Sequence, residues 1–130
     1  MNIPQELKYS KSDEWIRVEG STARMGISDF AQSQLSDVVY VEVHPSSGES
    51  LPQGKSVASV ESVKAAAEVY LPVGGVITKL NEALSGTPEL LNKDPYGEGW
   101  IVQFTLTNPA ELDGMMDSRT YEAYCAGRAH

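Results

Sequence analysis

The chain has 130 residues, 41% of them apolar, which fits one domain over residues 1–130 with a single modest core. The 18 acidic residues outnumber the 10 Lys and Arg and give a formal net charge of −8, which opposes binding to nucleic acid phosphates and favours partners that meet an acidic surface. No apolar run approaches the length of a transmembrane helix, so no membrane association is predicted.

The N-terminal segment and the cysteine count bear on the compartment. Residues 1–15 contain neither a secretory apolar stretch nor an Arg-rich transit segment. We therefore expect a bacterial cytoplasmic protein, or a trimmed organellar form in the mitochondrial matrix, and the initial Met favours the first. Cys125 stands alone, which excludes an internal disulfide and a paired-thiol metal motif, and we expect it to be half-buried on the last helix.

Strand patterns dominate the first half of the chain. Alternating apolar residues predict a hairpin over residues 15–27 that turns at Gly20 and buries one face. Two polar side chains from Ser28 onward favour a short helix, because they accept from first-turn amides. Residues 38–43 are nearly all apolar, which predicts a strand at the centre of a sheet. Residues 44–55 are rich in Pro, Ser and Gly and predict a connecting loop.

The stretch around Lys64 is ambiguous from residue types alone. Ala, Glu and Lys favour a helix, on which Glu61, Lys64 and Glu68 would share one face. Against this, residues 56–60 and 69–71 have strand character, and the Pro and Gly residues that follow indicate a turn. Helix and hairpin stay equally open, and the hairpin would place Lys64 at its tip.

The second half adds strands and ends in a helix. Strands are predicted at residues 76–80 and 99–106, and one helical turn at residues 88–91. Residues 108–111 have the form of a helix start, with a capping side chain, a proline at the first position and an acid reaching back. The last helix is predicted over residues 118–124. Many short strands with helices at ends and connections indicate a small, mostly β domain.

Lys64 itself stands apart from other cations. It is the one Lys or Arg between Lys55 and Lys79. Three alanines follow it, and Ser62 and Val63 precede it, so an enzyme would approach the amine without meeting a bulky side chain. The position suits a modification site.

Other residue patterns carry no chemistry that we can assign. A Ser-His-acid hydrolase needs a well-placed imidazole, and the histidines are His44, before a proline, and His130, at the end. The paired glycines match no phosphate loop and the acids match no calcium loop, so no metal site is predicted. We therefore expect no catalytic residues, and a protein that is not an enzyme.

Six stretches resemble one known family, in the same order, over nearly the whole chain. They read KYSKSDEW, GISDFAQSQLSDVVYVEV, ESVKAAAEVYLPVGGVI, NEALSGTPELLN, DPYGEGWIV and TYEAY. The chain is similar to the H proteins of the glycine cleavage system, and its third stretch is similar to their lipoylation hairpin. The resemblance implies a flattened barrel-sandwich hybrid, like a lipoyl domain, of two antiparallel sheets with short helices and a C-terminal helix.

The resemblance also implies a cofactor. Lys64 would carry covalent lipoate, and the attaching enzyme would recognise the hairpin through Glu61, Ser62, Val63 and Ala65. Biotin carriers share this architecture but usually place Met beside the target lysine, whereas Val63 and Ala65 flank it here. This difference favours lipoate.

A carrier role and a set of partners follow from the same resemblance. The arm would take an aminomethyl group from a pyridoxal-phosphate glycine decarboxylase and deliver it to a tetrahydrofolate-dependent aminomethyltransferase. An FAD-containing dihydrolipoamide dehydrogenase would then re-form the disulfide. Lipoate-attaching enzymes are further partners, and the carrier is expected to be a monomer. An alternative stays open, namely a lipoyl relay to 2-oxoacid dehydrogenases or an unlipoylated H-like binding module.

A loaded arm should be shielded from water on the carrier, because an aminomethyl thioether hydrolyses. Ser12 and Glu14 are candidates that the family pattern supports, since a hydroxyl and a carboxylate hold a protonated amine by charge-assisted hydrogen bonds. Glu68 is a third candidate, although an exposed acid is as often solvated. The chain departs from the family at Asp13, where His is usual, and at Ser36, where Gly is common. Both departures bear on docking.

Overall fold

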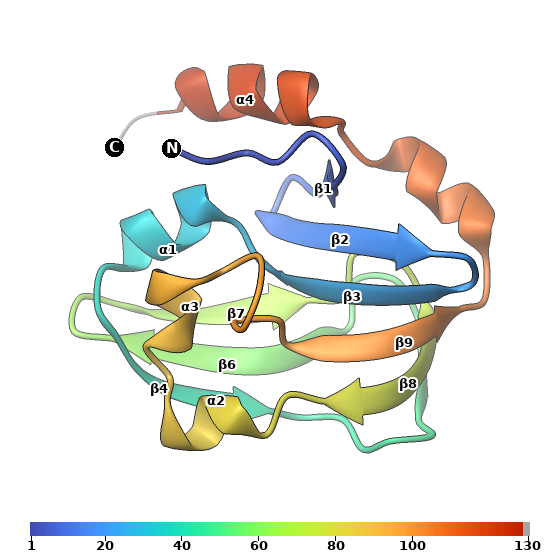
Figure 1. Ribbon diagram of the computed structural model, residues 1–130, viewed down its shortest axis with the longest axis horizontal. Helices are drawn as coiled ribbons and strands as arrows, with labels where there is room; N and C mark the ends of the chain where they lie inside the picture. The colour runs from blue at the N-terminus through green and yellow to red at the C-terminus, as the bar shows by residue number, and fades with distance from the viewer. Residues whose placement is uncertain (129–130) are drawn as a thin grey trace.

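The computed structural model describes residues 1–128, so His130 lies outside the described part. Its strands form two antiparallel sheets (Figure 1). In spatial order, the larger sheet contains β1 (Lys8–Tyr9), β2 (Glu14–Glu19), β3 (Thr22–Ile27), β9 (Val102–Leu106), β8 (Gly75–Leu80) and β5 (Ser50–Leu51). The smaller sheet contains β4 (Val38–Val43), β6 (Ser56–Ser62) and β7 (Ala66–Tyr70).

Short helices lie at the ends and connections of these strands. They are α1 (Asp29–Leu35), α2 (Ala83–Gly86), α3 (Leu90–Lys93), the 3-10 helix η1 (Pro109–Gly114) and the C-terminal α4 (Ser118–Ala126). The two sheets do not close into a barrel in the described part, because each ends in edge strands: β1 and β5, and β4 and β7. The predicted mostly β, two-sheet class is confirmed. No helix in residues 1–128 is long and apolar enough to span a membrane.

The main core fills the space between the sheets. Inward residues of both sheets are almost fully buried, as period-2 alternation requires, and they include Met25, Val60, Val69, Ile77 and Phe104. The register of β6 against β7 places Ala58 opposite Val69 and Val60 opposite Ala67. Burial of these small apolar side chains fixes one register, since a one-residue slip would turn them to solvent.

A second, aromatic cluster lies under α4, which runs across the N-terminal segment and β1 in Figure 1. Tyr9 and Tyr121 stack with their ring centroids 4.5 Å apart, and Trp15, Phe30 and Tyr96 are further aromatic members of the cluster. Cys125 belongs to it and is 1% exposed, so the expected half-burial was wrong. Residues from both chain ends meet in this cluster, so α4 anchors the N-terminal strands.

Two other expectations for single elements need correction. The run at residues 38–43 is not a central strand: β4 is an edge strand, and its Val39 and Tyr40 are 55% and 48% exposed. At Asn108 no side chain caps η1, and Glu111 accepts the N–H of Gly74 at 2.8 Å instead of reaching back. The predicted start of α1 is confirmed, because the Ser28 hydroxyl accepts the N–H of Ala31.

Candidate functional site

The β6–β7 hairpin settles the ambiguity around Lys64, because the two strands pair directly and no helix forms there. Ser62 closes the turn, and its N–H donates to the Ala65 carbonyl at 2.8 Å. The Ser62 hydroxyl accepts the N–H of Lys64 at 3.2 Å and that of Ala65 at 2.9 Å. One serine therefore organises the whole tip.

Lys64 is exposed at this tip and forms no ion pair within residues 1–128. Its neighbour Val63 is 69% exposed, while the Val63 N–H donates to the Asp37 carbonyl at 3.0 Å. That bond ties the tip to the segment between α1 and β4. The backbone is thus fixed while the amine stays accessible, which fits a covalently attached group.

The other residues expected at the hairpin lie around the lysine. Glu61 and Ala65 are exposed and Ser62 is half-buried. Glu61 pairs with Ala66 on β7 and with Tyr40 on β4, so it stands on the three-stranded sheet one residue before the turn.

Ser12 and Glu14 are brought into direct contact. The Glu14 carboxylate is 1% exposed, and its Oε1 accepts the hydroxyls of Ser12 at 2.5 Å and Ser10 at 2.6 Å. Its Oε2 accepts the N–H of Tyr70 at 3.1 Å. Glu14 begins β2 in the larger sheet, whereas Tyr70 is the last residue of β7 in the smaller sheet. The carboxylate therefore joins the two sheets at the end of β7 that lies away from the Lys64 turn.

Burial raises the pKa of Glu14, while hydrogen bonds from Ser10, Ser12 and Tyr70 act in the opposite direction. Within residues 1–128 this buried carboxylate has neutral donors and no ion pair, so an added ammonium group would be favourable there. The exposed side chain of Ser12 lies on the solvent side of this acid.

Glu68 is not part of this cluster. It accepts the hydroxyls of Ser56 at 2.6 Å and Ser59 at 2.5 Å, and its Oε1 lies 3.8 Å from His44 Nε2. Those two serine hydrogen bonds lower its pKa. No hydrogen bond or ion pair within residues 1–128 joins Glu68 to Ser12 or Glu14, so the structure separates the third candidate from the first two.

Sequence reasoning missed two parts of the Glu14 site. Ser10 was not named, although its spacing of two residues from Ser12 and of four from Glu14 was a signal for a shared acceptor. The Tyr70 N–H carries no such signal, because its availability depends on β7 being an edge strand.

Asp13, one of the departures from the family pattern, holds this loop in place. Its Oδ1 accepts the Tyr121 hydroxyl and an Arg128 N–H, each at 2.8 Å. Burial raises the pKa of Tyr121 far above its ordinary value, so the hydroxyl stays protonated and donates. The Arg128 guanidinium lies over the Phe30 ring, 4.0 Å from its centroid. The C-terminal helix is thus fastened to the Ser12–Glu14 loop.

No group of three or more His, Cys, Asp or Glu residues in the described part is arranged to hold a metal ion.

Comparisons with known proteins give one consistent result. The profile of the family described as Glycine cleavage H-protein matches residues 7–128. A glycine cleavage system H protein of Symbiobacterium thermophilum is 50% identical over 123 residues, covering 95% of each chain. That of Thermotoga maritima is 47% identical over 119 residues, covering 92% of this chain and 95% of the relative.

A solved structure agrees with the sequence comparisons. The crystal structure of a glycine cleavage system H protein from Mycobacterium marinum superposes with a TM-score of 0.83 at 31% identity, covering 93% of this chain and 97% of that one. The fold is thus that of a small two-sheet domain with an exposed lysine at the turn of one hairpin, and the alignments cover nearly the full length of this chain and of its relatives. The chain belongs to the glycine cleavage H-protein family.

Proposed function

We propose that this chain is the lipoyl-bearing carrier of the glycine cleavage system, with lipoate in amide linkage on Lys64. The observation that supports this most is the hairpin tip, where Lys64 is exposed and unpaired within the described part while Ser62 fixes the backbone beneath it. An enzyme that attaches lipoate needs access to the amine and a rigid recognition element, and Glu61, Ser62, Val63 and Ala65 supply that element.

The chain's residues have a positioning role in this proposal, and the chemistry belongs to the attached group and to the partner enzymes. When bound, the lipoyl group would supply a dithiol that accepts an aminomethyl group from glycine decarboxylase, yields it to the aminomethyltransferase and is reoxidised by dihydrolipoamide dehydrogenase. The carrier is then not itself an enzyme. Because its relatives are bacterial, we propose that it works in the bacterial cytoplasm. We also propose that it acts as a monomer.

Ser12 and Glu14 are proposed to receive the amine of the loaded arm. Glu14 is too buried for an ammonium to reach without displacing a donor, and the exposed Ser12 hydroxyl is the one that can rotate away. An N–H of the amine would then replace the serine O–H at Oε1, and the Ser12 oxygen, once turned, would accept a second N–H of the same amine. Glu68 is left out of this shield because it contacts different residues.

The carrier proposal is tested by Lys64→Arg, which keeps the positive charge and removes the nucleophilic amine. Lys79→Arg on β8 is the matched control, since Lys79 is also exposed. With the partner enzymes added, we expect glycine cleavage to vanish in Lys64→Arg and to persist in the control. Activity retained by Lys64→Arg contradicts the proposal, while lipoylated wild type without glycine cleavage activity favours the relay.

The shield is tested by Glu14→Gln on the loaded carrier, with Glu68→Gln as the control. A charge-assisted hydrogen bond contributes about 1.5–3 kcal/mol, so formaldehyde and ammonia release should rise roughly tenfold or more in Glu14→Gln. Ser12→Ala should act in the same direction and more weakly. Equal release rates in wild type and Glu14→Gln, with normal loading, would mean that Glu14 serves only the joint between the sheets.

A further inference from the structure

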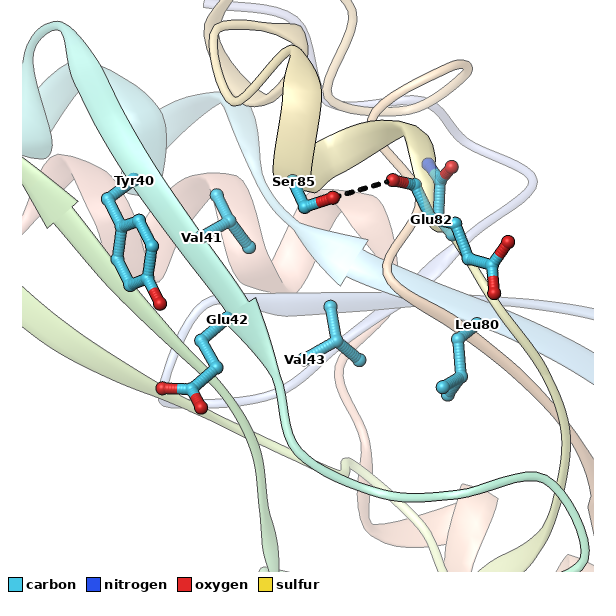
Figure 2. Close-up of a pocket in the computed structure, with 8 residues that line it drawn as sticks. Tyr40, Val41, Glu42, Val43, Leu80, Glu82 and Ser85 are labelled. Atoms are coloured by element: carbon cyan, nitrogen blue, oxygen red, sulfur yellow. Dashed lines mark hydrogen bonds between the residues drawn. The ribbon is translucent and has the colours of Figure 1, made fainter.

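An open groove lies on the far side of the smaller sheet from β7, between β4 and the segment that connects β8 to α2. Its volume is about 510 Å³, within the range of roughly 300–1,000 Å³ over which proteins bind ligands. Figure 2 shows Val41 and Val43 pointing from β4 toward the wall that carries Leu80 and Ser85. Neither Lys64 nor the Glu14 cluster lines this groove.

The backbone of β4 presents unpaired hydrogen-bonding groups along the groove. The His44 N–H donates to the carbonyl of Val57 on β6 at 2.9 Å. Because backbone groups alternate in direction along an antiparallel strand, the N–H and C=O groups of Val41 and Val43 point away from β6. Within residues 1–128 no hydrogen bond joins these groups to any partner. At the start of the strand, in contrast, the Val38 N–H is capped by Asn92 Oδ1 at 2.8 Å.

This pattern distinguishes β4 from a protected edge. Native edge strands are usually covered, charged or capped, because unpaired N–H and C=O groups attract another strand. Here the Asn92 cap stops at Val38 and α2 contacts part of β4, while the backbone groups of Val41 and Val43 face a groove. Its walls combine apolar Val43 and Leu80 with polar Asn81 and Ser85. An extended peptide would satisfy them by strand addition, with its alternate side chains resting on Val43 and Leu80.

The charges around the groove determine what kind of strand fits. Glu42 and Glu82 are the charged residues among its lining, and both are exposed. A second copy of this chain pairing through the same edge would bring Glu42 opposite its own counterpart, and like charges directly opposite are destabilising. The net charge of −8 adds to that repulsion. A segment bearing Lys or Arg meets the opposite condition.

We propose that the open edge of β4 is a docking site for an extended, basic segment of a partner protein, which adds as a strand along Val41 and Val43. Lys or Arg side chains of that segment reach Glu42 and Glu82, and apolar side chains between them fill the groove. Because Tyr40 on β4 pairs with Glu61 on β6, a partner held here lies on the same sheet as the Lys64 hairpin. The proposal does not depend on lipoylation.

The test uses the unlipoylated full chain and a short capped peptide in which lysine and valine alternate. Amide hydrogen exchange is measured by NMR with and without the peptide. We expect exchange at Val41 and Val43 to slow at least tenfold, while that of Glu42, whose N–H already faces β6, does not change. The same peptide methylated on its alternate backbone nitrogens should bind about tenfold more weakly, because it lacks the paired donors.

Protein variants separate strand pairing from simple charge attraction. Val43→Pro removes one open-edge donor at a position where edge strands tolerate proline, and it should weaken binding with the melting temperature nearly unchanged. Glu42→Lys with Glu82→Lys should weaken binding, whereas Glu19→Lys at the end of β2, outside the groove, should leave it close to wild type.

Three outcomes would overturn the proposal. One is the absence of binding. Another is binding that leaves Val41 and Val43 exchange unchanged, which means that the peptide is held by charge alone. The third is slower exchange at these residues as the protein concentration rises without peptide, which makes a second copy the occupant.

Discussion

Two non-glycine residues of the described part have positive φ, and they stand at the two positions where the resemblance implies a different residue in the family. Asp13 has φ 76° and Ser36 has φ 64°. Asp tolerates the left-handed region, and its carboxylate is held by Tyr121 and Arg128. Ser36, the residue that ends α1, has ψ −149°, a combination that is essentially restricted to glycine. Backbone strain is therefore expected at Ser36 and not at Asp13.

Ser36→Gly should stabilise the fold by about 1 kcal/mol, because glycine adopts this backbone conformation without strain and the Ser36 side chain is exposed. The melting temperature should rise by about 3 °C. Ser33→Gly, in the middle of α1, is the control and should lower stability by about 0.5–1 kcal/mol. A Ser36→Gly protein that melts below wild type would show that no strain resides there.

Glu14 gives a prediction about pH. Its pKa in the folded chain is raised above the ordinary value of 4.5 by burial, so the folded state binds more protons than the unfolded state between those two values. Stability should therefore fall as pH rises from about 4.5 through the raised pKa, and then level off. Glu14→Gln removes this slope. Urea unfolding at a series of pH values gives the free energy of unfolding of each protein. The wild-type value minus the Glu14→Gln value should decrease as pH rises. A flat or rising difference would mean that the three donors outweigh burial.

At the scale of elements, α4 and the Ser12–Glu14 loop act as one unit. Arg128 and Asp13 form an ion pair at 2.8 Å with side chains 25% and 18% exposed, and Tyr121 adds a second bond to the same carboxylate oxygen. Because Tyr121 and Arg128 both hold the Asp13 carboxylate, damage to α4 should be felt at the neighbouring Glu14.

A double-mutant cycle measures this coupling. Arg128→Met keeps most of the stem and removes the charge, and Asp13→Asn suits the positive φ. The two changes should couple by about 1 kcal/mol or more, because the pair is largely shielded from water. Arg119→Met on α4 is the control, since Arg119 is exposed and forms no ion pair within residues 1–128. Additive effects of Arg128→Met and Asp13→Asn would contradict a coupled pair.

The elements also show where sequence patterns suffice. The β2–β3 hairpin, α1 and α4 follow from alternation and capping residues, which act locally. The apolar run of β4 gives the wrong location, because an edge strand that packs under α2 on one side and exposes Val39 and Tyr40 on the other has the same composition as a central strand. The hairpin at Lys64 was undecidable locally, because strand pairing across Ala66 and Ala67, not helix propensity, determines it.

At the scale of the whole molecule, the candidate site depends on how the two sheets meet. Lys64 can be proposed from its neighbours in the sequence, since its isolation from other cations is a local property. The hydrogen-bond partners of Glu14 cannot all be predicted in this way. The Tyr70 N–H belongs to the other sheet, and it is available because β7 is an edge strand of that sheet. Glu68 shares the hairpin with Lys64 in sequence but is held by Ser56 and Ser59, a pairing set by the β6–β7 register.

The central claim is that Lys64 carries one lipoyl group. The most direct measurement is the intact mass of the protein from its native source, or from a lipoylating host, followed by peptide mapping. We expect one added lipoyl mass, located on the peptide that contains Lys64 and absent from Lys64→Arg prepared in the same way. An unmodified chain from a host that lipoylates its other carriers, or a lipoyl group on a different lysine, would contradict the account.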